Sequence, residues 1–313
     1  MALSTPELWT ALDSVISIPI IPFEDGKIDY EGHAKNIAYL MSNNHLDGGR
    51  KRVIAVAGTS LIHHIDAEDQ IRLMELTGQQ MGGEGVLMSG VVPNPIGSAG
   101  RIIEAQSKLA YPPDVYLLMP LSGIGNAAGL YQQYMEFGEH CGTEFNARFL
   151  YYLRQKSERD TAVRLINDSP HFVGMKVGTD EGDVSPSVAA VSEDCGMVIW
   201  GIGDRSTRAA ELGARGHTSG INIVVARASD AINNAQRRGD YETSRQVENE
   251  IAPLEEIRFR DGRMYNYSAV VEAMHLGGFD DVEGGSGGPF NPRVPPEVVR
   301  EVEAVVENIK HYH

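Results

Sequence analysis

The stretch Phe172-Val173-Gly174-Met175-Lys176-Val177-Gly178 is an apolar run that ends on one lysine, with a glycine before and after it. A short apolar run followed by an amphipathic segment is typical of a buried strand that leads into a helix. The helix is predicted at 185–192, and the unit before it has the same form, with a strand at 147–153 and a helix at 159–167. Outward from this stretch, the same unit recurs along most of the chain.

Eight such strand–helix units are predicted. The predicted strands are 15–21, 53–57, 86–92, 115–119, 147–153, 172–176, 197–201 and 218–224, and the predicted helices are 30–42, 67–81, 98–110, 129–140, 159–167, 185–192, 206–212 and 229–238. Alternation of this kind indicates parallel strands joined by helical crossovers. Eight units favour a closed (β/α)8 barrel over an open sheet.

The competing architecture is the open, doubly wound α/β sheet, which usually carries a glycine-rich nucleotide loop after its first strand. Here the first strand leads into Pro19-Ile20-Ile21-Pro22-Phe23-Glu24-Asp25-Gly26, which cannot cradle a pyrophosphate. Residues 241–313 are predicted to be helical, with helices at 241–257, 265–276 and 295–309. We therefore expect a (β/α)8 TIM barrel at 1–240 and a C-terminal helical region at 241–313 that packs on it.

The composition narrows the function. A formal net charge of −16 argues against nucleic acid and against anionic membrane surfaces as partners. The two cysteines, Cys141 and Cys195, have no metal-ligand spacing, and His63-His64 lacks further ligands, so neither a metal nor another cofactor is expected. Because the N-terminus has no basic region followed by an apolar one, and no apolar run could span a bilayer, we expect a soluble, cytoplasmic protein.

Lys176 is the first candidate for chemistry. Of the seven lysines, it alone stands where a strand should be buried. Burial of an ammonium group is costly and lowers its pKa, and a neutral amine can attack a ketone to form a Schiff base. The alternative is a lysine that merely ends a strand and reaches water.

In a barrel enzyme, catalytic groups lie at the carboxyl ends of the strands. Other candidates at these ends are the Gly58-Thr59-Ser60 loop, Tyr151-Tyr152, Gly201 and Ser219. The loop at 58–60 offers two hydroxyls for a carboxylate, or is an ordinary turn. Adjacent tyrosines on a strand point to opposite faces, so one of the pair should face the barrel interior, as a proton carrier or as core.

Taken together, these motifs resemble the pyruvate-dependent class I aldolases typified by dihydrodipicolinate synthase and N-acetylneuraminate lyase, from about Ser14 to Glu303. The opening Ile18–Phe23 is similar to that family's first strand. Gly58-Thr59-Ser60 is similar to its carboxylate loop, and Gly174-Met175-Lys176 to its Schiff-base signature. By the same resemblance, Tyr151 stands at the position of the catalytic tyrosine.

Four departures from the family pattern limit what the resemblance implies. Leu61-Ile62 replaces the Gly-Glu that usually follows the loop, and Pro120-Leu121-Ser122-Gly123 replaces Pro-Tyr-Tyr, so a relay tyrosine is missing. Tyr151-Tyr152-Leu153-Arg154 replaces Tyr-Asn-x-Pro. The arginine that binds the second substrate's carboxylate in the synthases has no secure match, although Arg154 or Lys156 could substitute.

The resemblance implies a Schiff-base lyase or aldolase that acts on pyruvate or a 2-keto-3-deoxy acid, usually as a homo-oligomer, a tetramer or a dimer. Lys176 and Tyr151 would be catalytic, and Gly58, Thr59, Ser60, Gly201 and Ser219 would bind the 2-oxo acid. The alternatives are dihydrodipicolinate synthase itself and a keto-acid-binding paralogue without turnover. A metal-dependent aldolase on the same barrel would need acidic or histidine ligands at the strand ends, and the sequence offers none.

Overall fold

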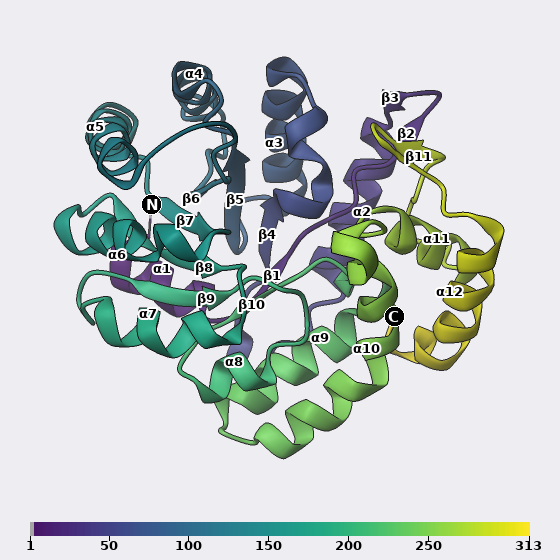
Figure 1. The fold of residues 1–313 in the computed structure, drawn as a ribbon. Coiled ribbons are helices and arrows are strands. Elements are labelled where there is room, and N and C mark those ends of the chain that lie inside the picture. Colours follow the sequence, from purple (N-terminus) through teal and green to yellow (C-terminus); the bar gives the residue numbers. More distant parts are fainter. Residues whose placement is uncertain (1–2) are drawn as a thin grey trace.

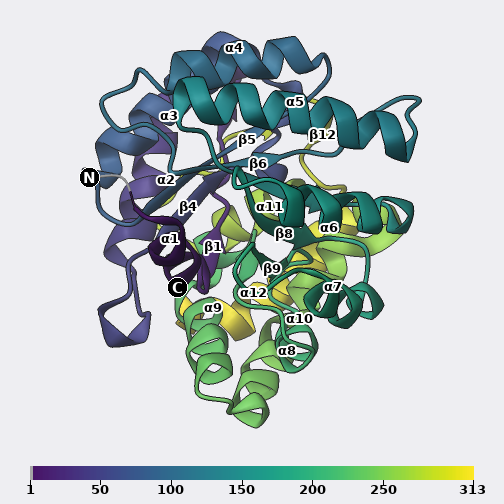
Figure 2. The ribbon, with the colours of Figure 1, turned by 90° about the vertical axis from the view of Figure 1, so that its left-hand side faces the viewer.

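The computed structural model describes residues 3–313, and Met1 and Ala2 lie outside the described residues. Eight parallel strands form a closed barrel in the order β1-β10-β9-β8-β7-β6-β5-β4 (Figures 1 and 2). They are β1 (Val15–Ser17), β4 (Val53–Val56), β5 (Val86–Val91), β6 (Val115–Leu118), β7 (Phe149–Leu153), β8 (Phe172–Val177), β9 (Met197–Trp200) and β10 (His217–Ser219). The predicted (β/α)8 TIM barrel with a C-terminal helical region is confirmed.

Helices follow the strands and surround the barrel (Figure 1). They are α2 (Tyr30–Ser42), α3 (Ala67–Met81), α4 (Ile96–Gln106), α5 (Ala127–Phe145), α6 (Arg159–Asp168), α7 (Val184–Ala190), α8 (Thr207–Glu211) and α9 (Asn222–Arg237). Helices α2 and α3 have the predicted bounds. Asp29 caps α2 by accepting a hydrogen bond from the Gly32 N–H, and Gly82 ends α3 in the left-handed conformation.

The predicted strand at 218–224 is wrong in its second half. Strand β10 ends at Ser219, Ile221 is the N-cap of α9, and the apolar residues from Ile223 onward belong to that helix. The Asn222 N–H donates to Ser219 Oγ, which turns the chain from strand into helix. Because this part of α9 is buried on all sides, its apolar run carries no amphipathic period that would separate it from a strand.

An N-terminal helix that the sequence reading did not predict, α1 (Thr5–Leu12), packs against the barrel core. Ser4 and Glu7 form a capping box at its start. Leu8 and Leu12 join the apolar side chains of the barrel interior, and Trp9 Nε1 donates to the Val173 carbonyl at 2.7 Å. Two short hairpins were also not predicted: β2 (Phe23–Glu24) with β3 (Lys27–Ile28), and β11 (Gly287–Gly288) with β12 (Asn291–Pro292).

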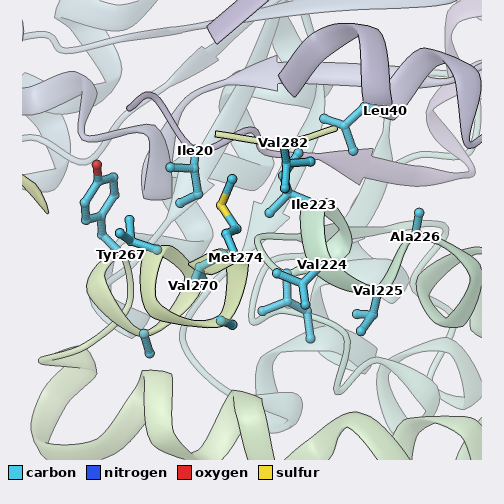
Figure 3. Close-up of a cluster of buried hydrophobic side chains, with 14 of the residues drawn as sticks. Ile20, Leu40, Ile223, Val224, Val225, Ala226, Tyr267, Val270, Met274 and Val282 are labelled. Atoms are coloured by element: carbon cyan, nitrogen blue, oxygen red, sulfur yellow. The ribbon is translucent and has the colours of Figure 1, made fainter. Parts of the chain in front are cut away.

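The C-terminal helices are α10 (Tyr241–Arg263), α11 (Ser268–Leu276) and α12 (Pro296–Ile309), and they pack on one side of the barrel (Figure 1). Their apolar side chains share one core with α2 and α9, part of which is drawn in Figure 3. The Tyr267 hydroxyl donates to the Ile21 carbonyl at 2.9 Å, and so ties this region to the segment after β1. Within residues 3–313, every helix is too short or too polar to cross a bilayer.

Helix α10 is interrupted near its end. Arg260 has an extended conformation, and Asp261, Gly262 and Arg263 all have positive φ. This break turns the chain so that residues 258–266 approach the carboxyl ends of the barrel strands. The C-terminal region therefore contributes to the mouth of the barrel as well as to the shared core.

Candidate active site

A cavity of about 470 Å³ opens at the carboxyl ends of the barrel strands. The lining residues lie at the ends of seven strands and around the break in α10, and they include no aspartate or glutamate. They are Ile18, Gly58, Thr59, His63, Met119, Pro120, Tyr152, Arg154, Gln155, Lys176, Gly201, Gly203, Thr218, Gly220, Arg258, Phe259, Arg263 and Asn266. The cavity is thus locally cationic, although the whole chain carries a net charge of −16.

Lys176 lies inside this cavity and is only 3% exposed. Strand β8 pairs with β7 so that Lys176 is level with Tyr152, and its Nζ lies 4.2 Å from the centroid of the Tyr152 ring. Gly201 on β9's carboxyl end makes room for the lysine, because a Cβ there would lie 2.8 Å from both Cγ and Cε of Lys176. The side chain is therefore held in the barrel mouth and does not reach bulk solvent.

The environment of Lys176 favours the neutral amine. Within residues 3–313, no carboxylate oxygen lies within 4.0 Å of its Nζ. Burial lowers the pKa of the amine, Tyr152 partly opposes this, and the positive charges of Arg263 and Arg154 lower the pKa further. A buried lysine without an acidic partner can supply the lone pair that attack on a ketone requires.

The structure corrects the placement of the two tyrosines. Tyr151 lies on the outer face of β7, where its ring packs against Tyr134 and its hydroxyl donates to Glu158 at 2.9 Å. Tyr152 lines the cavity beside Lys176. The physical reason is strand register: residues level with each other on neighbouring parallel strands point to the same face, and Lys176 is level with Tyr152 while Met175 is level with Tyr151.

Three basic side chains surround the Tyr152 hydroxyl. Arg154 Nη1 donates to it at 3.2 Å, and Lys176 and Arg263 lie nearby. Burial alone raises the pKa of this phenol, but the positive charges of Lys176 in its protonated form, of Arg154 and of Arg263 together outweigh burial and lower the pKa to about 7. On Tyr151, burial and the Glu158 carboxylate both raise the pKa. Only Tyr152 of this pair can exchange a proton near neutral pH.

We expect a phenolate to form in the native protein near neutral pH. With a pKa lowered to about 7, Tyr152 is mostly a phenol below that pH and mostly a phenolate above it. Ultraviolet difference absorbance should show a tyrosinate signal with this midpoint in the wild-type chain and none in Tyr152→Phe. Arg154→Gln removes a positive charge and should move the midpoint to higher pH. A wild-type chain whose tyrosines ionise only in strong alkali would contradict the site electrostatics.

The predicted binding residues divide into two groups. Gly58, Thr59 and Gly201 line the cavity. Ser60 does not, because its fully buried hydroxyl donates to the Pro19 carbonyl at 2.6 Å. Ser219 does not either, because its hydroxyl faces a buried polar network and donates to Asp204 at 2.5 Å. Neither the Ser60 nor the Ser219 side chain therefore lines the cavity, and the predicted substrate binding by these two residues stays a prediction without support from their hydroxyl groups.

Four cavity residues from the C-terminal region were missed, namely Arg258, Phe259, Arg263 and Asn266. The guanidinium groups of Arg258 and Arg263 lie 5.0 and 5.4 Å from the centroid of the Phe259 ring. The one sequence signal was Asp261-Gly262, a typical turn pair between the predicted helices at 241–257 and 265–276. This pair indicates a turn in the chain but does not predict that the neighbouring residues lie at the mouth of the barrel.

Of the two candidate substitutes for the family's arginine, only Arg154 reaches the cavity. Lys156 lies at the surface, where its Nζ pairs with Asp180 at 2.5 Å. Within residues 3–313, no group of three or more His, Cys, Asp or Glu side chains is arranged to hold a metal ion. The cavity instead presents an amine, a phenol and guanidinium groups, which suits an anionic carbonyl compound.

Comparison with known proteins agrees with this geometry. The profile of the Dihydrodipicolinate synthetase family matches residues 11–292. The 4-hydroxy-tetrahydrodipicolinate synthase of Pseudomonas aeruginosa is 24% identical over 77% of this chain and 80% of its own length. That of Thermodesulfovibrio yellowstonii is 26% identical over 79% and 82%. The crystal structure of dihydrodipicolinate synthase from Bacillus clausii superimposes with a TM-score of 0.84 at 21% identity, covering 96% of this chain and 98% of that one, which shows a shared fold.

Proposed function

Because the chain belongs to the Dihydrodipicolinate synthetase family, we propose that it is a Schiff-base-forming lyase or aldolase that acts on pyruvate or a 2-keto-3-deoxy acid. The observation that carries this proposal is Lys176, a buried amine with no carboxylate partner within 4.0 Å among residues 3–313, at the mouth of a cationic cavity. Positive charge in the cavity favours a 2-oxo acid over a neutral ketone.

In the proposed reaction, the neutral Nζ of Lys176 adds to the ketone carbon, and loss of one water gives an iminium. The iminium withdraws electrons, so a C3–H or C3–C4 bond can break and leave its electron pair as an enamine. Tyr152, with a pKa lowered to about 7, takes up and returns the protons of these steps. Hydrolysis of the final iminium releases the product and restores the amine. Tyr152 replaces Tyr151 in this role because Tyr151 lies outside the cavity.

Borohydride reduction tests this proposal. It converts an iminium into a stable secondary amine, so treatment in the presence of pyruvate should attach one pyruvate to each chain. Peptide mass spectrometry should place the attachment on Lys176. A protein that gains no pyruvate, or that gains it on a surface lysine such as Lys156, contradicts the proposal.

The runner-up is dihydrodipicolinate synthase itself, supported by the names of the relatives and by the position of Arg154 in the cavity. The loop Pro120-Leu121-Ser122-Gly123, without a tyrosine, favours a different reaction partner. Release of pyruvate from a panel of 2-keto-3-deoxy acids, with aspartate semialdehyde plus pyruvate as the comparison, distinguishes the two activities. A paralogue that only binds keto acids would form the adduct and turn over no member of the panel. A homo-oligomeric state and a cytoplasmic location stay predictions.

A further inference from the structure

The proposed reaction of Lys176 assigns no role to Arg258, a charged side chain of the cavity. Arg258 of α10 lines the cavity and yet is only 1% exposed. Its Nη1 pairs with the buried carboxylate of Glu255 at 2.5 Å, and its Nε and Nη2 donate to the backbone oxygen and Oδ1 of Asn266 at 3.2 and 2.8 Å. A buried guanidinium is costly unless it is fixed in this way, so its position beside the cavity is strongly constrained.

Arg258 and Asn266 point toward the same atom of the predicted carboxylate loop. Arg258 Nη2 and Asn266 Nδ2 each lie 3.4 Å from Thr59 Oγ1. Both distances are at the long end of the hydrogen-bond range, so the hydroxyl engages neither donor fully. Two N–H donors and the Thr59 hydroxyl therefore converge at one place on the cavity surface.

Gly220 keeps this place open. It follows β10 and also lines the cavity. A Cβ at this position would clash with Arg258 Nη2 and would lie 3.0 Å from Thr59 Oγ1. A glycine here leaves the donors accessible from the cavity, and any side chain would cover them.

Only one hydroxyl of the loop, that of Thr59, lines the cavity. The sequence predicted that Thr59 and Ser60 together bind the carboxylate, but the Ser60 hydroxyl is committed to the Pro19 carbonyl. Beside that hydroxyl, Arg258 and Asn266 supply further N–H donors for a carboxylate. A guanidinium binds a carboxylate more strongly than a hydroxyl does, because its hydrogen bonds are charge-assisted.

We propose that Arg258 and Asn266 of the C-terminal region, together with Thr59, bind the carboxylate of the 2-oxo acid substrate. Glu255 is a positioning residue that holds Arg258 in place from behind. The inference rests on the proposed Schiff-base function, which supplies the ketone at Lys176. It assigns the recognition of the acid group to a segment that follows the barrel strands in the chain.

Pyruvate and methyl pyruvate test this assignment, because they present the same ketone and only pyruvate is an anion. The measured quantity is the ketone concentration that gives half-maximal borohydride trapping. In the wild-type chain this concentration should be about 10–100-fold lower for pyruvate than for methyl pyruvate. In the double variant Arg258→Met/Glu255→Gln, which leaves no lone buried carboxylate, the two concentrations should converge. Only the binding of pyruvate should weaken in this variant, because only pyruvate has a carboxylate that the Arg258 guanidinium can bind. Asn266→Ala, a milder change, should narrow the difference in part.

The matched control is Arg52→Met/Asp230→Asn. Arg52 is also 1% exposed and pairs with a buried carboxylate at 2.6 Å, but it does not line the cavity. This variant should lose stability and keep the wild-type preference for pyruvate.

Equally weakened binding of both ketones in the Arg258 variant would mean a purely structural role for Arg258 and would overturn the inference. An unchanged preference for pyruvate in that variant would overturn it as well. Failure of the wild-type chain to trap either ketone would remove the proposed function. Calorimetric titration with pyruvate would then decide the carboxylate site by itself.

Discussion

Replacement of Lys176 by methionine is expected to abolish both the borohydride-stable adduct and all turnover. Methionine matches the length and apolar stem of lysine but has no nucleophile. Because Lys176 is 3% exposed and has no acidic partner within residues 3–313, an apolar side chain removes an uncompensated buried amine. The variant should therefore fold, with a thermal midpoint equal to or above that of the wild type. Mass spectrometry after reduction with pyruvate and a pyruvate-release assay measure the two effects.

Lys156→Met is the control for this experiment. Lys156 is an exposed lysine whose Nζ pairs with Asp180 at 2.5 Å, and exposed pairs contribute little to stability. It should keep the adduct and the turnover of the wild type. If Lys176→Met still gains a pyruvate, or still turns over substrate, the reactive amine lies elsewhere and the mechanism is lost.

The second large effect is expected for Tyr152→Phe, which should lower kcat by about 10²–10⁴-fold, the usual contribution of a placed acid or base. The phenol is the cavity group with a pKa lowered to about 7, and phenylalanine keeps the ring but cannot carry a proton. Trapping of pyruvate should persist, because the Lys176 amine remains. The split between a large loss in kcat and a retained adduct identifies a proton carrier.

Tyr151→Phe makes the same chemical change one residue earlier. Its hydroxyl donates to Glu158 on the outer face of β7, so its loss should cost about 1 kcal/mol of stability and leave kcat within a few-fold of wild type. A large loss of kcat in Tyr151→Phe together with a small one in Tyr152→Phe would restore the assignment made from the sequence and contradict the structure.

The barrel could be predicted from the sequence because local patterns determine its parts. Helices α2 and α3 were predicted with their observed ends, and the structure shows that local residues set those ends, since Asp29 caps the start of α2 and Gly82 ends α3. Lys176 was recognisable because a charged residue interrupts a strand that is otherwise apolar. These signals depend only on neighbours along the chain.

The rest of the site depends on contacts between distant segments. The register of β7 against β8 decides whether Tyr151 or Tyr152 faces inward. The alternation of side chains within one strand does not reveal this register. Arg258 reaches the barrel mouth because α10 packs on the barrel and breaks after Arg258. The orientation of the Ser60 hydroxyl could not be predicted either, because its hydrogen-bond partner, the Pro19 carbonyl, is distant in the sequence.

The late position of residues 258–266 has a consequence for protein synthesis. All eight barrel strands leave the ribosome before this segment does, so the amine of Lys176 can be in place while Arg263 is still untranslated. Since Arg263 is one of the charges that lower the pKa of that amine, the lysine of a nascent chain is more basic and therefore less nucleophilic at neutral pH. The full lowering of the pKa of Lys176 therefore requires that the segment 258–266, which is synthesised after every barrel strand, has folded onto the barrel.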